Sequence, residues 1–388
     1  MDWVITGGQA LLEDGPARGD VALLARGDVA LSDGMVAARP ASGARRFDAR
    51  GLLVLPGLVD IHGDAHERQF QPRPGIGIPP AIAVRDSAAQ LLACGITTAF
   101  LGVTLSWEPG LRGIESWRST LAAVEAARAG AGVDLRIHCR FEADNLDALE
   151  EVLADIAAGR VQLLAYNDHT PAIVKRIADP AQAAKYAARA GLPAAEFVAL
   201  AERAWSRRPD VPEAQARLAA AARAAGIPML SHDDATPEMR ATFRALGASI
   251  CEFPMAEAVA EAARAAGEHV VMGAPNVVRG GSHMGWSAAA PLAERGLVTV
   301  LASDYVWPAM LEAAFVMAGR GVLDLARAWA LVSANPAAAA GLGDRGRIAP
   351  GLRGDVVVVD PATRTPVATF AAGRLAWLSP AGGARLAA

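Results

Sequence analysis

Eight short apolar runs, each followed by an Ala-rich segment, are the strongest constraint on how this chain of 388 residues can fold. The intervening segments, such as AQARLAAAARAAG, combine good helix formers with a final glycine that suits a helix C-terminus. Alternating strands and helices are typical of parallel βα units, which close into a (β/α)₈ TIM barrel or spread into an open doubly wound sheet. Ionisable side chains end most of the runs, where a barrel carries its active site, so the pattern favours an α/β fold of the barrel type. The runs are residues 57–62, 96–102, 134–142, 161–169, 227–234, 249–254, 269–276 and 298–304.

The two ends of the chain have a different character. Short strand-like pieces separated by Gly and Asp turns occupy the first 55 residues, and DVVVVD, TPVATF and RLAWL continue the same style near the C-terminus. We therefore expect one small β domain built from residues 1–55 and 347–388, beside a hydrolase barrel formed by residues 56–346.

Composition excludes several classes of partner. Hydrophobic residues make up 53% of the chain and the formal net charge is −4, so a large core is expected. The basic residues are scattered among helical segments, which argues against nucleic acid. No apolar run approaches the length of about 18 residues that a membrane span needs, so we expect no membrane association.

The cysteines and the N-terminus indicate a compartment. Cys94, Cys139 and Cys251 lie far apart and form no CxxC pair, which fits a reducing environment. The N-terminal stretch MDWVITGGQALLEDG lacks the basic and then apolar order of a secretory leader. These features predict a cytoplasmic protein. Barrels of this size often pair through their outer helices, but the sequence leaves open whether this chain forms a homo-oligomer.

The stretch DIHGDAHERQFQPRPG directly follows the first barrel run. His62 and Asp64 are two residues apart at a strand end, so both side chains would face the mouth of the barrel. An imidazole and a carboxylate that converge in this way form half of a divalent metal site. Alone, the pair is better explained by a histidine that hydrogen-bonds a neighbouring carbonyl.

Recurrence favours the metal site. Five different runs end in side chains that bind metals, which is more than one tetrahedral zinc needs and suits two divalent ions. We expect zinc, although these ligands also admit manganese or iron. Glu142 is the candidate bridge between the ions, and Asp304 could both contact one ion and carry protons as the catalytic residue. The full predicted set is His62, Asp64, Glu142, His169, His232 and Asp304.

Such a centre predicts hydrolysis. A metal-bound water with a pKa near about 7 supplies hydroxide for attack at a carbonyl, amidine or phosphoryl centre. The sequence contains no GxxxxGK[ST] phosphate loop, GxSxG elbow or HExxH helix that would suggest another chemistry. The histidines at 138 and 269 are interpreted as structural.

Substrate contacts are expected on the same side of the barrel. The loop NVVRGGSH offers Arg279, Ser282 and His283 beside two glycines, and loops after the seventh and eighth strands often hold phosphate. An ordinary glycine turn with a solvated arginine is the alternative. Together with the loop side chains nearer the predicted metals, this loop indicates a small anionic substrate. Those further candidates are His66, Arg68 and Arg73.

These motifs resemble the amidohydrolase superfamily. The order PGLVDIHGDAHERQFQPRPG, DHTP, SHDDAT, EFP, MGAPNVVRGGSH and ASDY is most similar to its phosphonate-metabolism branch, the α-D-ribose 1-methylphosphonate 5-triphosphate diphosphatases. The resemblance covers nearly the whole chain. It implies a metal-dependent barrel with a composite β domain, and water attack at the α-phosphorus that releases diphosphate and leaves a 5-phosphate. It also supports the predicted ligands and places Arg279, Ser282 and His283 on the phosphate side.

The chain departs from that branch close to the expected substrate. AHER follows the HxD pair where the branch has a pattern closer to NLEK, and Ala-Ile follows DHTP where the branch tends to have Gly-Gln. A paralogue with a changed ligand would explain both departures. The alternatives are a hydrolase of cyclic amides, amidines or N-acyl groups, and a metal-binding or ligand-sensing protein without activity.

Overall fold

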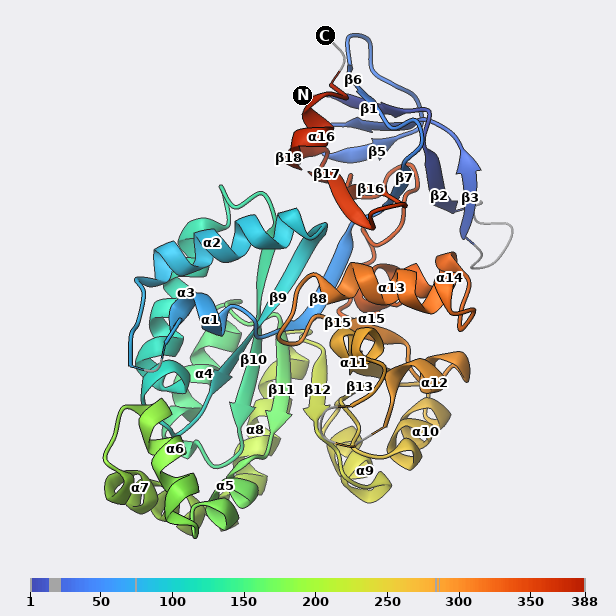
Figure 1. The fold of residues 1–388 in the computed structure, drawn as a ribbon. Coiled ribbons are helices and arrows are strands. Elements are labelled where there is room, and N and C mark those ends of the chain that lie inside the picture. The colour runs from blue at the N-terminus through green and yellow to red at the C-terminus, as the bar shows by residue number, and fades with distance from the viewer. Residues whose placement is uncertain (1, 14–21, 74, 283–284, 286, 387–388) are drawn as a thin grey trace.

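The barrel is formed by eight parallel strands in chain order (Figure 1). The computed structural model describes residues 2–13, 22–73, 75–282, 285 and 287–386. Each strand pairs with the next one along the chain, which confirms the predicted (β/α)₈ fold with its small β domain and excludes a doubly wound order. The strands are β8 (Leu58–Gly63), β9 (Ile96–Leu105), β10 (Asp134–Glu142), β11 (Leu163–Asn167), β12 (Met229–His232), β13 (Ile250–Glu252), β14 (His269–Gly273) and β15 (Val300–Ala302).

The first and last strands meet through the segment that follows β15. The backbone N–H of Asp304 donates to the carbonyl of His62 at 2.9 Å, and the N–H of Asp64 donates to the carbonyl of Asp304 at 2.9 Å. Below them, the buried carboxylate of Asp60 accepts hydrogen bonds from the backbone N–H of Ser303 at 3.0 Å and from its hydroxyl at 2.6 Å. The contacts that close the barrel therefore also fix three of the predicted site residues.

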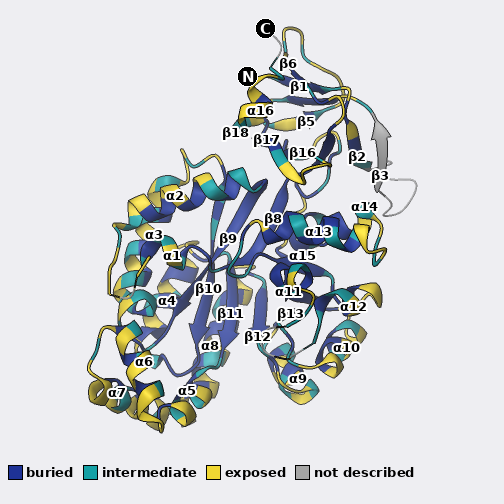
Figure 2. Cartoon of the chain, viewed as in Figure 1, coloured by how far each residue is buried: buried dark blue, intermediate teal, exposed yellow. Residues whose placement is uncertain are grey.

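Helices cover the outside of the barrel, with buried inner faces and exposed outer faces (Figure 2). Helix α6 shows why they form where they do. It begins after Asp179, whose side chain accepts from the N–H of Ala181 at 2.9 Å, and it ends at Gly191, which has a positive φ of 71°. The helices and 3₁₀ turns between β8 and β12 are α1 (Glu67–Phe70), α2 (Pro80–Ala93), η1 (Gly110–Arg112), α3 (Ile114–Ala127), η2 (Leu146–Ala148), α4 (Leu149–Ala157), α5 (Thr170–Arg176), α6 (Pro180–Ala190), α7 (Ala194–Ser206), η3 (Arg208–Asp210) and α8 (Val211–Ala224). Those after β12 are α9 (Pro237–Ala245), α10 (Glu257–Ala265), α11 (Ala274–Arg279), α12 (Ala289–Glu294), α13 (Ala309–Gly319), α14 (Leu325–Ala330), α15 (Ala334–Ala339) and α16 (Pro380–Gly383).

Both chain ends contribute to the small β domain at the top of Figure 1. In one of its two sheets, β7 from the N-terminal part pairs with β16 from the C-terminal part. The rings of Trp3 and Phe47 each pack edge-on against Phe370, with centroids 5.5 and 5.9 Å apart. The residue boundaries given above for the two domains stay a prediction. The strands are β1 (Trp3–Thr6), β2 (Gln9–Glu13), β3 (Ala22–Arg26), β4 (Val29–Ser32), β5 (Met35–Ala37), β6 (Arg45–Asp48), β7 (Leu53–Pro56), β16 (Val356–Asp360), β17 (Thr365–Ala371) and β18 (Arg374–Leu378).

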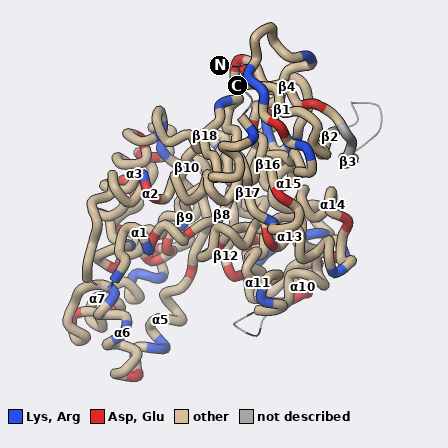
Figure 3. Tube along the Cα trace, turned by 45° about the horizontal axis from the view of Figure 1, so that its top comes forward, with Lys and Arg blue, Asp and Glu red and all other residues tan. Residues whose placement is uncertain are grey.

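Charged residues of both signs are spread over the described part of the chain (Figure 3). Within the same residues, none of the helices has both the length and the apolar character that crossing a bilayer requires. The expectations about nucleic acid, self-association and cytoplasmic location stay predictions.

Replacing Phe370 by alanine tests whether the two chain ends share one core. The ring is fully buried between residues of the N-terminal part, so Phe370→Ala should lower the free energy of unfolding by about 3–5 kcal/mol. Thr365→Ala, at an exposed position on the same strand, is the control and should change stability by less than about 0.5 kcal/mol. Urea denaturation of the two variants measures this difference. Equal stabilities would contradict a shared core.

Candidate metal centre

A pocket of about 280 Å³ opens at the carboxyl ends of the barrel strands. Its lining includes four of the predicted metal ligands, contributed by the first, fifth and eighth strands of the barrel or by the residues just after them: His62, Asp64, His232 and Asp304. His169 lies beside them, because its Nε2 atom is 3.7 Å from a carboxylate oxygen of Asp233, another lining residue. The structure thus brings five of the six predicted ligands together.

Three residues that follow barrel strands have left-handed backbone conformations. Asp233, Phe253 and Asp304 have φ values of 59°, 52° and 54°, which are uncommon for residues with a Cβ atom. Strained conformations of this kind cluster at functional sites, where the surrounding structure holds them in place. Here all three residues line the pocket.

Glu252 lies between two of the histidines. Its two carboxylate oxygens are each 2.8 Å from an Nδ1 atom, one of His62 and one of His232. The contact with His232 is a well-formed hydrogen bond, whereas the contact with His62 is short but poorly aligned. The two rings are nearly parallel, with an interplanar angle of 9°. Because Nδ1 of each ring faces Glu252, Nε2 is the nitrogen left for a metal, and a carboxylate behind a histidine is the usual support of such a ligand.

Burial keeps both of these histidines neutral. It lowers the pKa of His62 to about 3, with help from the positive charge of Arg140. Burial also lowers the pKa of His232 well below its ordinary value, again assisted by Arg140. A metal-binding histidine must be unprotonated, so both rings are in the form that a divalent ion requires.

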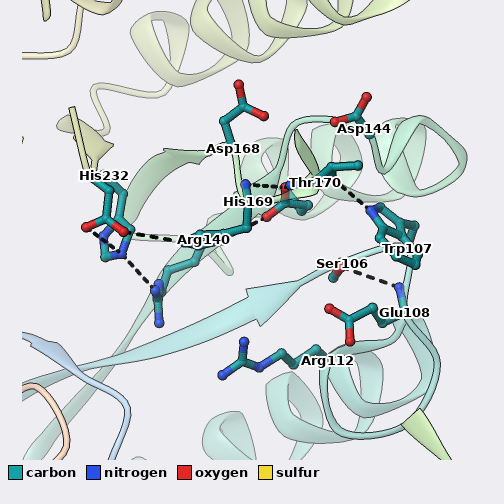
Figure 4. Close-up of polar contacts among 12 residues, drawn as sticks. Ser106, Trp107, Glu108, Arg112, Arg140, Asp144, Asp168, His169, Thr170 and His232 are labelled. Carbon is teal, nitrogen blue, oxygen red and sulfur yellow. Dashed lines mark hydrogen bonds and ion pairs between the residues drawn. The ribbon is translucent and has the colours of Figure 1, made fainter. Parts of the chain in front are cut away.

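Glu142 supports His169 from behind. One of its oxygens accepts from the backbone N–H of His169 at 2.7 Å and from the N–H and the hydroxyl of Thr170, each at 2.9 Å. The other oxygen is 3.1 Å from Nδ1 of His169. The role of a bridge between two ions, predicted for Glu142, does not fit this geometry, because both oxygens already have donors. Trp107, from the loop after β9, extends the network by donating to the hydroxyl of Thr170 at 2.9 Å (Figure 4).

The pKa values of His169 and Asp304 are shifted toward their protonated forms. Burial alone would lower the pKa of His169, but the hydrogen bonds with Asp233 and Glu142 outweigh it and raise the pKa to about 9. Burial, together with the nearby charge of Asp64, raises the pKa of Asp304 to about 7. Without a metal ion, His169 is therefore protonated at neutral pH, and the carboxyl of Asp304 is about half protonated.

Among the described residues, four groups of three side chains could each hold a divalent cation, and two of these groups do not include the supporting carboxylates Glu142 and Glu252. One of these two donor sets is His62, Asp64 and Asp304, and the other is His169, His232 and Asp233, with the donors of each set within 4.8 Å of one another. A mixture of imidazole nitrogens and carboxylate oxygens, with the histidines held from behind, is the chemistry that zinc, manganese or iron accepts.

Asp233 and Glu252 are members of the site that the sequence interpretation missed. Both signals were present, because Asp233 directly follows His232 in SHDD and Glu252 lies within the sixth run, SICEFP. His138 and His269, which were predicted to be structural, have contacts that fit this role. Nδ1 of His138 is 3.0 Å from the carbonyl oxygen of Ile61. Nδ1 of His269 is 3.3 Å from the hydroxyl oxygen of Thr299.

Three of the predicted substrate contacts lie at the pocket or its rim. Ser282 lines the pocket, as does Tyr305. The guanidinium of Arg279 is 3.3 Å from the hydroxyl of Tyr305, and that of Arg68 donates to the backbone carbonyl of Tyr305. Two arginines thus flank one wall of the pocket.

Two of the other predicted contacts lie elsewhere, and the third is not among the described residues. His66 is buried, and its Nδ1 atom is 3.2 Å from the carbonyl of Gly63, so it has a backbone partner. Arg73 is exposed, and its backbone pairs with Ile76 outside the pocket lining. His283 lies outside the described residues.

The fold and the donor sets define a hydrolase of the metal-dependent barrel class. A family model described as the amidohydrolase family matches residues 121–376. The alpha-D-ribose 1-methylphosphonate 5-triphosphate diphosphatase of Escherichia coli (strain K12) is 35% identical over an alignment of 324 residues, which covers 80% of this chain and 84% of that protein. The chain therefore belongs to the amidohydrolase family.

Solved structures agree on the fold. An amidohydrolase from an environmental sample of the Sargasso Sea superposes with a TM-score of 0.67 at 16% identity, over 97% of this chain and 93% of its own. The dihydropyrimidinase of Brevibacillus agri superposes with a TM-score of 0.57 at 15% identity, over 97% and 95% of the two chains. At these identities the likeness extends to the fold alone.

Glu252→Gln tests whether this carboxylate supports the centre. Glutamine cannot accept from both Nδ1 atoms, so the dissociation constant for the metal should rise by about 10–100-fold. Competition with a chromophoric chelator measures the affinity, and Glu261→Gln on the outer helix α10 is the control. Unchanged affinity in a folded Glu252→Gln protein would remove Glu252 from the centre.

Metal affinity should depend on pH through Asp304. A proton occupies this carboxyl below about pH 7 in the metal-free protein, and a bound ion must displace it. For an ion at His62, Asp64 and Asp304, the apparent association constant should therefore fall about tenfold for each pH unit below 7 and level off above it, whereas an ion bound by His169 would extend the slope to about pH 9. His62, whose pKa is about 3, adds no slope in this range. Affinity measured from pH 5 to pH 9 checks the profile, and a slope that persists in Asp304→Asn would assign the proton to another group.

Proposed function

We propose that this protein hydrolyses a ribose 5-triphosphate that carries a 1-phosphonate, most simply α-D-ribose 1-methylphosphonate 5-triphosphate, to the 5-phosphate and diphosphate. The observation that carries the proposal is the 35% identity to a diphosphatase of this specificity, maintained over most of both chains. Its geometric support is a pocket that combines metal donors with Ser282 and a wall flanked by Arg68 and Arg279.

The side chains around the pocket suit attack by water. A divalent ion held by them, most simply zinc, would supply a Lewis acid and would activate a water molecule. Asp304 lies in the pocket with a carboxyl whose pKa is close to neutral, so it is placed to accept a proton from the attacking water and to return it to the leaving group. In the reaction, the water oxygen forms a bond to the α-phosphorus while the bond from that phosphorus to the α–β bridging oxygen breaks.

Arginines at the rim suit an anionic substrate. Arg68 and Arg279 reach Tyr305 from different segments, one after β8 and one at the end of α11. Both could contact phosphate oxygens at the pocket entrance, where guanidinium groups bind such oxygens in pairs.

Hydrolysis of a cyclic amide, amidine or N-acyl group is the second candidate. One feature favours it: among the described residues, Arg140 is the only arginine in the lining of this pocket, and a triphosphate commonly meets several cations. An uncharged substrate would need fewer of them. Of the departures noted in the sequence, AHER includes Arg68 at this wall, whereas Ala172 and Ile173 lie on α5, shortly after His169.

A phosphorus NMR time course distinguishes the candidates. Metal-loaded protein incubated with α-D-ribose 1-methylphosphonate 5-triphosphate should produce diphosphate, and Asp304→Asn should reduce the rate by about 10²–10⁴-fold because the proton acceptor is lost. Removing the metal with a chelator should stop the reaction, and returning it should restore the rate. Unchanged triphosphate signals with turnover of a lactam or amidine would instead select the second candidate.

A further inference from the structure

Arg140 is buried at the centre of the pocket. It follows His138 and precedes Glu142 on the same face of β10, because alternate residues of a strand point to the same side. Its aliphatic stem passes Gly102 of the neighbouring strand, where an added Cβ atom would lie 3.3 Å from the Arg140 Cδ atom. The glycine leaves room for an arginine to cross the barrel mouth.

The guanidinium contacts one member of each donor set. Nη1 is 3.3 Å from a carboxylate oxygen of Asp64, and Nη2 is 3.1 Å from Nε2 of His232. Only 7% of the side chain is exposed. Figure 4 shows the side chain extending from its strand toward His232. The positive charge therefore lies between the two places where metal ions would otherwise sit.

The guanidinium of Arg140 disfavours binding of a second metal ion. Glu252 holds Nδ1 of His232, so Nε2 carries the only lone pair that the ring can offer, and the guanidinium already donates to it. An arginine keeps its charge at any pH a protein experiences. A divalent ion in the set of His169, His232 and Asp233 would have to displace this donor and would meet a fixed positive charge in a poorly solvated site.

We propose that the guanidinium of Arg140 serves as the second cation of the centre, so that the protein holds one divalent ion, at His62, Asp64 and Asp304. This inference rests on the metal-dependent part of the proposed function. It replaces the two ions expected from the sequence with one ion and one fixed charge. His169 and Asp233 then face the guanidinium and the substrate, and an anionic oxygen in the pocket lies between two cations of different kinds.

Metal stoichiometry tests the proposal directly. The wild-type protein, stripped with a chelator, reloaded with excess zinc or manganese and desalted, should contain one ion per chain by plasma mass spectrometry. Arg140→Met removes the charge but keeps most of the volume, and it should raise the content to two ions. Arg136→Met is the matched control, because Arg136 lies on the same strand but pairs with Asp134 away from the pocket.

Several outcomes would overturn the proposal. Two tightly held ions in the wild type would do so without any variant, which keeps the test valid if Arg140→Met fails to fold. A single ion in both wild type and a folded Arg140→Met would show that Arg140 does not limit the number of ions. No bound ion in the wild type would reject the inference and the metal centre together. Diphosphate release is measured separately, so one bound ion without that activity would reject the proposed substrate alone.

Discussion

Glu252 is the group on which the rest of the centre depends. A fully buried carboxylate is costly unless charged or hydrogen-bonding partners surround it, and here its partners are the Nδ1 atoms of two histidines. His232 is its direct neighbour in the pairing of β12 with β13, whereas His62 reaches it from β8, across the barrel. One side chain thus sets the orientation of ligands from two distant parts of the sheet and turns their Nε2 atoms toward the pocket. Glu142 does the same for His169.

The closure of the barrel positions the other residues of the site. Parallel strands that close on themselves bring their carboxyl ends to one rim, so residues more than 200 positions apart in the chain become neighbours. The closing contacts at Asp304 place its carboxyl beside Asp64, and the resulting repulsion adds to burial in raising its pKa to about 7. The positions of the donor side chains and the raised pKa of Asp304 therefore both follow from the barrel topology.

The fold and the strand-end positions of most of the predicted ligands could be predicted from the sequence, because both depend on local patterns. Strand and helix periodicity is a local property, and the position of His62, Asp64, His232 and Asp304 at strand ends follows from it. Periodicity does not show which residues each of these side chains contacts. A bridging role was predicted for Glu142 because a carboxylate can offer one oxygen to each ion, and its hydrogen bonds to the start of α5 cannot be seen in a pattern of residue types.

Two further residues were overlooked for related reasons. Glu252 lies inside its short run, SICEFP, and has no neighbouring histidine to draw attention to it. Arg140 lies inside a strand, where a single arginine suggests a solvated edge, and only the assembled barrel shows it buried against Asp64 and His232. The rim arginines Arg68 and Arg279 lie on α1 and α11, outside the barrel strands, so strand periodicity does not place them.

The most direct test of this account is an anomalous difference map from crystals of the metal-loaded protein, recorded at the absorption edge of the bound metal. The account predicts a peak at the mouth of the barrel, bound through Nε2 of His62 and carboxylate oxygens of Asp64 and Asp304, with Glu252 against Nδ1 of His62. A peak bound through Nδ1, an ion bridged by Glu142, or a peak away from these residues would contradict it.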